Sequence, residues 1–138
     1  MEETAAKTNK KILVIDDERS VLAYLETLLQ DNGYGTVCAE NGRIGFEKAK
    51  SEKPDLVCLD ITMPEESGIR CYRNLKEDPE LASTPVVIIT AVTGEGGDPE
   101  PFKDFISTRK QVPRPEAFFS KPIDQQEFLN TVTKILNV

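Results

Sequence analysis

Short apolar runs alternate along this chain with longer segments in which apolar residues recur every three or four positions. The short runs are continuous rather than alternating, which is typical of parallel strands buried on both faces. We predict five strands, at about 10–15, 34–39, 56–60, 85–90 and 117–120. The longer segments have the spacing of amphipathic helices, and their apolar faces are expected to cover the strands.

Helices are predicted between successive strands. The first spans about 19–31, the second follows Asn41, and the last begins after Asp124, which has capping-box spacing to Glu127. Alternating strands and helices predict βαβ units, and therefore an α/β fold with a doubly wound five-stranded parallel sheet and helices on both faces. We expect one domain, at 9–138, after a flexible tail at 1–8.

The segment 91–116 is the least regular part of the chain. It is rich in glycine at its start and in proline at its end, and its centre has helical spacing. A connection of this length without structure is unusual in a compact domain, so we expect a short helix at about 99–110 between two irregular stretches.

Composition excludes several classes of function. The net charge of −7 and the pI near 4.7 argue against nucleic acid as a partner, because proteins that bind it carry a basic face. No apolar run is long enough to span a membrane, and no signal peptide is evident, so we expect a cytoplasmic protein. The chain has no histidine, which excludes histidine-based catalysis and imidazole metal ligands. Its three cysteines are interpreted as small buried apolar residues in a reducing compartment.

Reactive side chains follow four of the predicted strands. Asp16 and Asp17 follow the first, Asp60 ends the third, Thr90 ends the fourth and Lys121 follows the fifth. Ligands of open parallel sheets bind beyond the carboxyl ends of the strands, so these groups are expected to converge. Adjacent carboxylates favour a hard cation such as Mg²⁺, and a carboxylate can also accept a phosphoryl group.

Each of these residues also has an ordinary structural interpretation. Asp16 and Asp17 suit a solvated turn or a helix cap, and Asp60 suits the end of a strand. Thr90 is a β-branched residue at home in a strand, and Lys121 is of a type that is mostly exposed. The functional interpretation depends on their order and shared position rather than on any single residue.

As a set, these motifs resemble the receiver domain of two-component response regulators. The resemblance rests on Ile-Leu-Val-Ile-Asp-Asp-Glu at 12–18, Leu-Val-Cys-Leu-Asp-Ile-Thr-Met-Pro at 56–64 with Gly68, Val-Val-Ile-Ile-Thr-Ala at 86–91, and Phe-Phe-Ser-Lys-Pro at 118–122. It covers about residues 10–137 and implies a flavodoxin-like sheet with strand order 2-1-3-4-5.

The resemblance also implies a role for each residue of the site. Asp60 is the implied phosphoacceptor, and Lys121 the implied partner of its phosphoryl oxygens. The implied Mg²⁺ ligands are Asp17, Asp16, Asp60 and the backbone carbonyl of Thr62. The implied phosphoryl donor is a phosphohistidine on a sensor histidine kinase or a histidine phosphotransfer protein.

The resemblance further implies a switch. Thr90 moves toward the phosphoryl group, and Phe118, three residues before Lys121, fills the space that it leaves; core packing is the alternative for Phe118. Thr62 and Val92 stand where relatives tune dephosphorylation, and neither can orient water strongly. We therefore expect a phosphorylated state that is not especially short-lived.

Thr90 and Lys121 are thirty-one positions apart, more than the family pattern leads us to expect, and the extra length falls where receivers usually have their output surface. We expect a stand-alone receiver or phosphorelay intermediate that acts through a protein partner, and not an enzyme with an external substrate. A receiver excised from a longer protein is also possible. Two other classes remain open: a haloacid-dehalogenase-like phosphatase with Asp60 as its nucleophile, and a receiver-like interaction module that is never phosphorylated.

Overall fold

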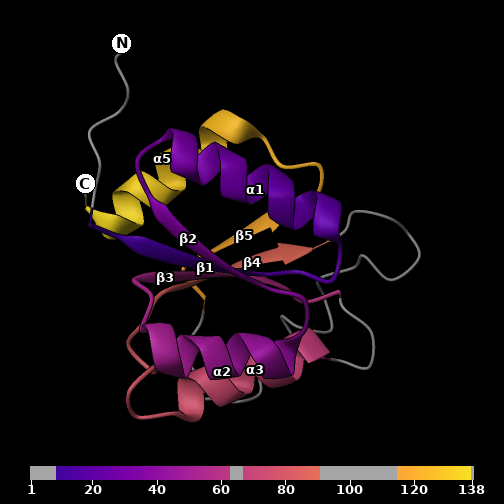
Figure 1. Ribbon diagram of the computed structural model, residues 1–138, viewed down its shortest axis with the longest axis vertical. Helices are drawn as coiled ribbons and strands as arrows, with labels where there is room; N and C mark the ends of the chain where they lie inside the picture. The colour runs from indigo at the N-terminus through magenta and orange to yellow at the C-terminus, as the bar shows by residue number, and fades with distance from the viewer. Residues whose placement is uncertain (1–8, 63–66, 91–114, 138) are drawn as a thin grey trace.

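A computed structural model describes residues 9–62, 67–90 and 115–137 and contains one parallel sheet (Figure 1). Its strands are β1 (Lys11–Ile15), β2 (Gly35–Ala39), β3 (Leu56–Asp60), β4 (Val86–Thr90) and β5 (Ala117–Ser120). The strand order is β2-β1-β3-β4-β5, and every neighbouring pair is parallel. The strand order implied by the family resemblance is therefore confirmed.

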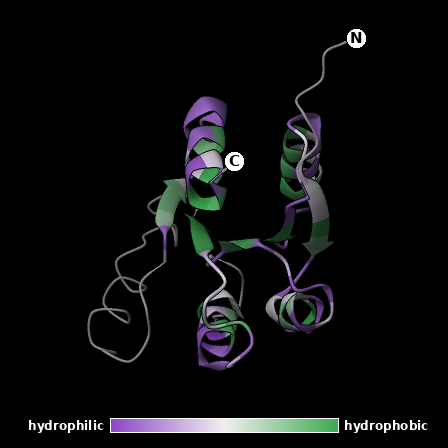
Figure 2. Cartoon of the chain, turned by 90° about the vertical axis from the view of Figure 1, so that its left-hand side faces the viewer, coloured by the Kyte–Doolittle hydropathy of each residue, from purple (hydrophilic) through white to green (hydrophobic). Residues whose placement is uncertain are grey.

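Helices cover both faces of the sheet. They are α1 (Arg19–Asp31), α2 (Gly42–Glu52), α3 (Ser67–Glu77) and α5 (Gln125–Leu136). Figure 1 shows α1 and α5 on one face and α2 and α3 on the other, and Figure 2 shows the same three layers from the side. The predicted doubly wound architecture is thus confirmed. The helix predicted at 99–110, the tail at 1–8 and Val92 lie outside the described residues.

Two apolar cores form on opposite faces of the sheet. Alternate residues of β1 divide between them: Leu13 and Ile15 face α2 and α3, whereas Ile12 and Val14 face α1 and α5. Successive strand side chains point to opposite faces, so a strand covered on both sides needs apolar residues at every position. This is the physical reason for the continuous runs in the sequence.

The helix ends follow local rules that are readable in the sequence. Asp124 accepts a hydrogen bond from the Glu127 backbone N–H at 2.9 Å, and Asn41 accepts one from Ile44 at 2.8 Å. Beyond the end of α1, Gly33 has φ 92°, a conformation that favours glycine. The predicted bounds of α1 match the observed ones.

The cysteine prediction is only partly correct. Cys58 in β3 and Cys71 in α3 are free thiols buried in the two cores, but Cys38 is only half-buried. Cys38 lies in β2, an edge strand that pairs only with β1 among the described segments and is less covered than the central strands. Within the described part of the chain, no helix is long and apolar enough to cross a membrane.

Candidate functional site: the carboxyl ends of the central strands

The sheet register brings two aspartates to the same level. Ile15 of β1 pairs with Leu59 of β3, so Asp16 and Asp60, the next residue of each strand, lie side by side. Asp16 is 1% exposed and Asp60 is also 1% exposed. Ionised carboxylates are rarely buried so completely unless cations or hydrogen bonds compensate them.

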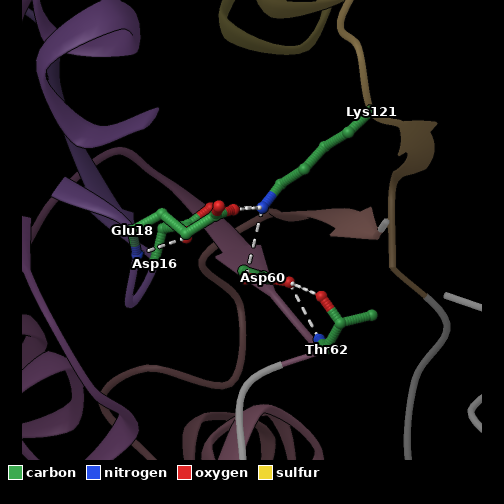
Figure 3. A network of polar contacts seen from close by, with 5 residues as sticks. All are labelled: Asp16, Glu18, Asp60, Thr62 and Lys121. Carbon is green, nitrogen blue, oxygen red and sulfur yellow. Dashed lines mark hydrogen bonds and ion pairs between the residues drawn. The ribbon is translucent and has the colours of Figure 1, made fainter. Parts of the chain in front are cut away.

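Lys121 supplies one such cation from the neighbouring side of the sheet. Its backbone N–H donates to the carbonyl of Thr90 at 2.8 Å, which fixes the point where the chain leaves β5. From there the side chain extends across the strand ends (Figure 3). The Nζ atom lies 3.5 Å from Asp60 Oδ2, 3.1 Å from Asp16 Oδ2 and 2.7 Å from Glu18 Oε1.

A third carboxylate completes an acidic cluster. Asp17 is exposed beside the two buried aspartates, and carboxylate oxygens of Asp16, Asp17 and Asp60 lie within 4.8 Å of one another. The Asp16 Oδ2 atom is buried and, although it lies near Lys121, accepts no hydrogen bond of good geometry from any described residue. Three carboxylates that share a single nearby lysine offer a surplus of hard oxygen ligands, which fits a divalent cation such as Mg²⁺.

The electrostatics of the cluster reflect this surplus of negative charge. Burial raises the pKa of Asp16 from 3.8 to about 6, and the nearby Asp60 carboxylate adds to the rise. Burial by itself would lower the pKa of Lys121, but its hydrogen bond to Glu18 and the charges of Asp60 and Asp16 reverse the direction and raise it. Lys121 is therefore protonated, and its single positive charge only partly compensates the negative charges of the carboxylates around it.

The segment after β3 holds Asp60 from its other side. The backbone N–H of Thr62 donates to Asp60 Oδ1 at 2.8 Å, and the Thr62 hydroxyl donates to the same oxygen at 2.5 Å. Figure 3 shows Thr62 and Lys121 on opposite sides of the carboxylate. In the first turn of α3, a Cβ on Gly68 would lie 2.5 Å from the Asp60 carbonyl oxygen, so glycine is needed for this close approach.

Thr90 and Phe118 lie on the strands beside Asp60. Thr90 is 2% exposed at the end of β4, and Ile61 donates to the neighbouring carbonyl of Ile89 at 3.1 Å. The register sets Ser120 opposite Thr90 and Phe118 opposite Ile88, so Thr90 and Phe118 point to the same face of the sheet. Phe118 is 40% exposed, which argues against the alternative of plain core packing for its side chain.

The structure therefore brings Asp16, Asp17, Asp60 and Lys121 together, with Thr62 and Thr90 on adjoining segments. Val92 is not among the described residues. Sequence reasoning missed one participant, Glu18, which makes the shortest of the three ion pairs that Lys121 forms with described residues. The third acid of the Asp-Asp-Glu run at 16–18 was the available signal, but its spacing alone cannot show that Lys121 reaches it.

Comparison with known proteins places this arrangement in a family. A family model described as the response regulator receiver domain matches residues 12–101. PilH of Pseudomonas aeruginosa is 32% identical over 126 residues, which cover 91% of this chain and 97% of PilH. The polar-differentiation response regulator DivK of Brucella anthropi is 30% identical and covers 92% of this chain, which spans 96% of DivK.

A solved structure gives the same result at the level of the fold. The chemotaxis response regulator CheY4 of Vibrio cholerae superposes with a TM-score of 0.75 at 24% identity, over 93% of this chain and 99% of that one. Receiver domains are signalling proteins that generally bind Mg²⁺ at an acidic pocket, and the aspartate cluster lies where such a pocket is expected. This chain is a receiver domain of the response regulator family and a component of two-component signalling.

Proposed function

We propose that this protein accepts a phosphoryl group on Asp60 from a phosphohistidine of a sensor histidine kinase or a histidine phosphotransfer protein. The observation that carries the proposal is the buried Asp60 carboxylate, whose Oδ2 faces Lys121 Nζ at 3.5 Å within a cluster of three carboxylates. Phosphoryl transfer requires mainly positioning and positive charge near the phosphoryl oxygens, and this site offers both. The protein is a signalling component rather than an enzyme with an external substrate.

Mg²⁺ is the proposed cofactor. Its ligands are the carboxylates of Asp17, Asp16 and Asp60, together with the backbone carbonyl of Thr62. When bound, the ion supplies positive charge that offsets repulsion among the carboxylates and stabilises the phosphoryl oxygens. Support comes from the mutual proximity of the three carboxylates and from the buried Oδ2 of Asp16, which has Lys121 at 3.1 Å but accepts no well-aligned hydrogen bond from the described residues.

The proposed step is a displacement at phosphorus. An Asp60 carboxylate oxygen forms a bond to the phosphorus, and the bond between phosphorus and the donor imidazole nitrogen breaks. The electron pair of that bond returns to the imidazole nitrogen, and the imidazole leaves as a neutral ring because its other nitrogen carries a proton. Lys121 stabilises the phosphoryl oxygens throughout, and Thr62 fixes the Asp60 carboxylate through its two hydrogen bonds to Oδ1.

Intact mass measurement with acetyl phosphate and Mg²⁺ tests the acceptor. The wild-type protein should gain the mass of one phosphoryl group, Asp60→Asn should gain none, and chelation of Mg²⁺ should prevent the gain. Asp55→Asn is a matched control, because Asp55 precedes the same strand at its opposite end, where it accepts a hydrogen bond from the Lys11 backbone. A gain that survives Asp60→Asn would exclude Asp60, and no gain in the wild type would favour the silent interaction module.

The proposed switch couples Thr90 to Phe118. Thr90 moves to bond the phosphoryl group, and the half-exposed Phe118 turns into the space on the same face of the sheet. The chain has no tryptophan, so Phe118→Trp introduces a single fluorescent reporter. Its emission should shift to shorter wavelength on addition of Mg²⁺ and beryllofluoride, which mimics a phosphoryl group. An unchanged spectrum despite bound beryllofluoride would refute the switch role.

We propose that the phosphorylated state is not especially short-lived. Thr62 directs its hydroxyl to Asp60 and has no acid or amide with which to orient a water molecule. Val92, at the second tuning position, also lacks such a group. Decay of the isolated phosphoprotein within seconds, followed by intact mass, would contradict this proposal.

A further inference from the structure

Lys121 forms ion pairs with Glu18, Asp16 and Asp60, and the three distances differ. Glu18 Oε1 is closest to its ammonium at 2.7 Å, Asp16 Oδ2 follows at 3.1 Å, and Asp60 Oδ2 is farthest at 3.5 Å. Figure 3 shows the Lys121 side chain crossing the strand ends to reach the Glu18 carboxylate. The residue that holds Lys121 most closely is therefore not the phosphoacceptor.

The backbone of Glu18 is fixed, whereas its carboxylate is committed only to Lys121 among the contacts described. Its N–H donates to Asp16 Oδ1 at 2.9 Å, and its carbonyl accepts from Val21 and Leu22 at the start of α1. Glu18 is the N-cap residue of α1, yet its side chain makes no capping hydrogen bond. The Glu18 side chain remains 57% exposed, in contrast to the buried Asp16 and Asp60.

We propose that Glu18 is a positioning residue that competes for Lys121 and holds its ammonium nearer to itself than to Asp60 until a phosphoryl group enters the site. This inference rests on the proposed function. To bond the phosphoryl oxygens, Lys121 exchanges the Glu18 carboxylate for them. Glu18 thereby weakens the binding of phosphoryl groups and keeps the resting state distinct from the phosphorylated one.

The Glu18–Lys121 ion pair is weak enough for a phosphoryl group to displace it. An ion pair with an exposed carboxylate contributes little free energy, because water and salt compensate both charges. A phosphoryl group carries up to about two negative charges and three acceptor oxygens, so it outcompetes one carboxylate. The competition should therefore reduce phosphoryl affinity by only about two- to fivefold, the range expected for one exposed ion pair.

Beryllofluoride binding by a Glu18→Gln variant tests the proposal. Titrated in Mg²⁺, this variant should bind about two- to fivefold more tightly than the wild type at low salt, and the difference should shrink at high salt. The matched control is Glu40→Gln. Glu40 is a half-exposed glutamate just after β2, and its partner is Arg19 at 2.9 Å. Glu40→Gln therefore removes the same charge as Glu18→Gln without changing the contacts of Lys121. Equal or weaker binding by Glu18→Gln, or equal tightening by Glu40→Gln, would overturn the proposal.

A second measurement needs neither metal nor phosphoryl mimic. In metal-free protein, the side-chain ¹⁵N signal of the Lys121 ammonium, assigned by its loss in Lys121→Arg, should shift in Glu18→Gln and remain in place in Glu40→Gln. An unshifted signal would refute the contact itself. If the wild type binds no beryllofluoride and gains no mass at Asp60, the proposed function fails, whereas wild-type binding without tightening in Glu18→Gln refutes only the role of Glu18.

Discussion

Two lysines of this domain have their ammonium groups drawn inward, and their partners differ in kind. Lys76, near the end of α3, is 9% exposed and donates to the backbone carbonyls of Ala82 at 3.3 Å and Thr84 at 2.8 Å. Lys121 lies among carboxylates whose combined charge exceeds its own. The neutral carbonyls around Lys76 use its ammonium to stabilise the turn after α3. The surplus negative charge around Lys121 instead leaves a site that can bind a cation or exchange one ionic partner for another.

The largest expected effect comes from removing the structural lysine. Lys76→Met keeps most of the apolar side chain, but it removes the ammonium that lies 5.9 Å from the centre of the Tyr72 ring and leaves two carbonyls without their donor. We expect the free energy of unfolding to fall by about 2 to 4 kcal/mol, measured by urea denaturation. Labelling of Asp60 by acetyl phosphate should persist wherever the protein is folded.

Lys50→Met is the matched control for that change. Lys50 also contacts the turn after α3, through Asp78 at 2.9 Å and Glu80 at 3.2 Å, but it is 40% exposed on the surface. The free energy of unfolding should fall much less in Lys50→Met than in Lys76→Met, because exposed ion pairs contribute little to stability. Equal losses in the two variants would remove the distinction between a buried structural lysine and a surface one.

Gly68→Ala tests how closely α3 must approach Asp60, the proposed phosphoacceptor. The added methyl group would overlap backbone atoms of Asp60 and Ile61, which cannot move without displacing the end of β3. We expect a loss of about 2 to 3 kcal/mol in the free energy of unfolding and slower phosphorylation of Asp60 by acetyl phosphate. The measurements are urea denaturation and the initial rate of mass gain.

Gly45→Ala separates the two effects of Gly68→Ala. A Cβ at Gly45 would also overlap its neighbour, but that neighbour is the Ile15 side chain, with Cγ1 at 2.8 Å, rather than backbone at the site. Stability should fall by about 1 to 2 kcal/mol while the rate of phosphorylation stays near that of the wild type. A normal phosphorylation rate in Gly68→Ala would show that the close approach serves stability alone.

Sequence patterns predicted the fold well because burial on both faces forces continuous apolar strands, and helix ends such as Asp124 follow local rules. They also identified the strand-end residues that meet at the acidic cluster, because parallel register aligns them. They could not show that Lys76 is buried against two backbone carbonyls or that Glu18 contacts Lys121. Those properties depend on how a turn or a long side chain folds over its neighbours, which leaves no periodic signal.

Removing one charge from the carboxylate cluster should stabilise the metal-free protein. Burial raises the pKa of Asp16 from 3.8 to about 6, so between these pH values the folded state binds more protons than the unfolded state. The free energy of unfolding therefore falls as pH rises through this window, by at most about 3 kcal/mol. Asp16→Asn cannot ionise and should be more stable by about 1 to 2 kcal/mol at pH 7.5 in EDTA, measured by urea denaturation.

The gain should largely disappear near pH 4, where the wild-type carboxyl is protonated in the folded state and partly protonated in the unfolded state. Asp17→Asn serves as control, because Asp17 is exposed and its removal relieves no burial. A destabilised Asp16→Asn at pH 7.5, or a gain of equal size at pH 4, would contradict the view that this cluster carries surplus charge.

Thiol labelling is the mildest test. It measures whether β3, which carries Asp60, and α3, which carries Lys76, open enough to expose their buried cysteines. Cys58 lies in β3 two residues before Asp60, and Cys71 lies in α3 with Lys76. Burial raises the pKa of each of these thiols to about 12, so neither should react with iodoacetamide at pH 8 in the folded protein. Half-buried Cys38, whose thiol pKa is also raised by burial, should react slowly and alone. One label per chain by intact mass is expected, against three in guanidinium, and labelling of Cys58 as fast as Cys38 would show that the strand carrying Asp60 opens readily.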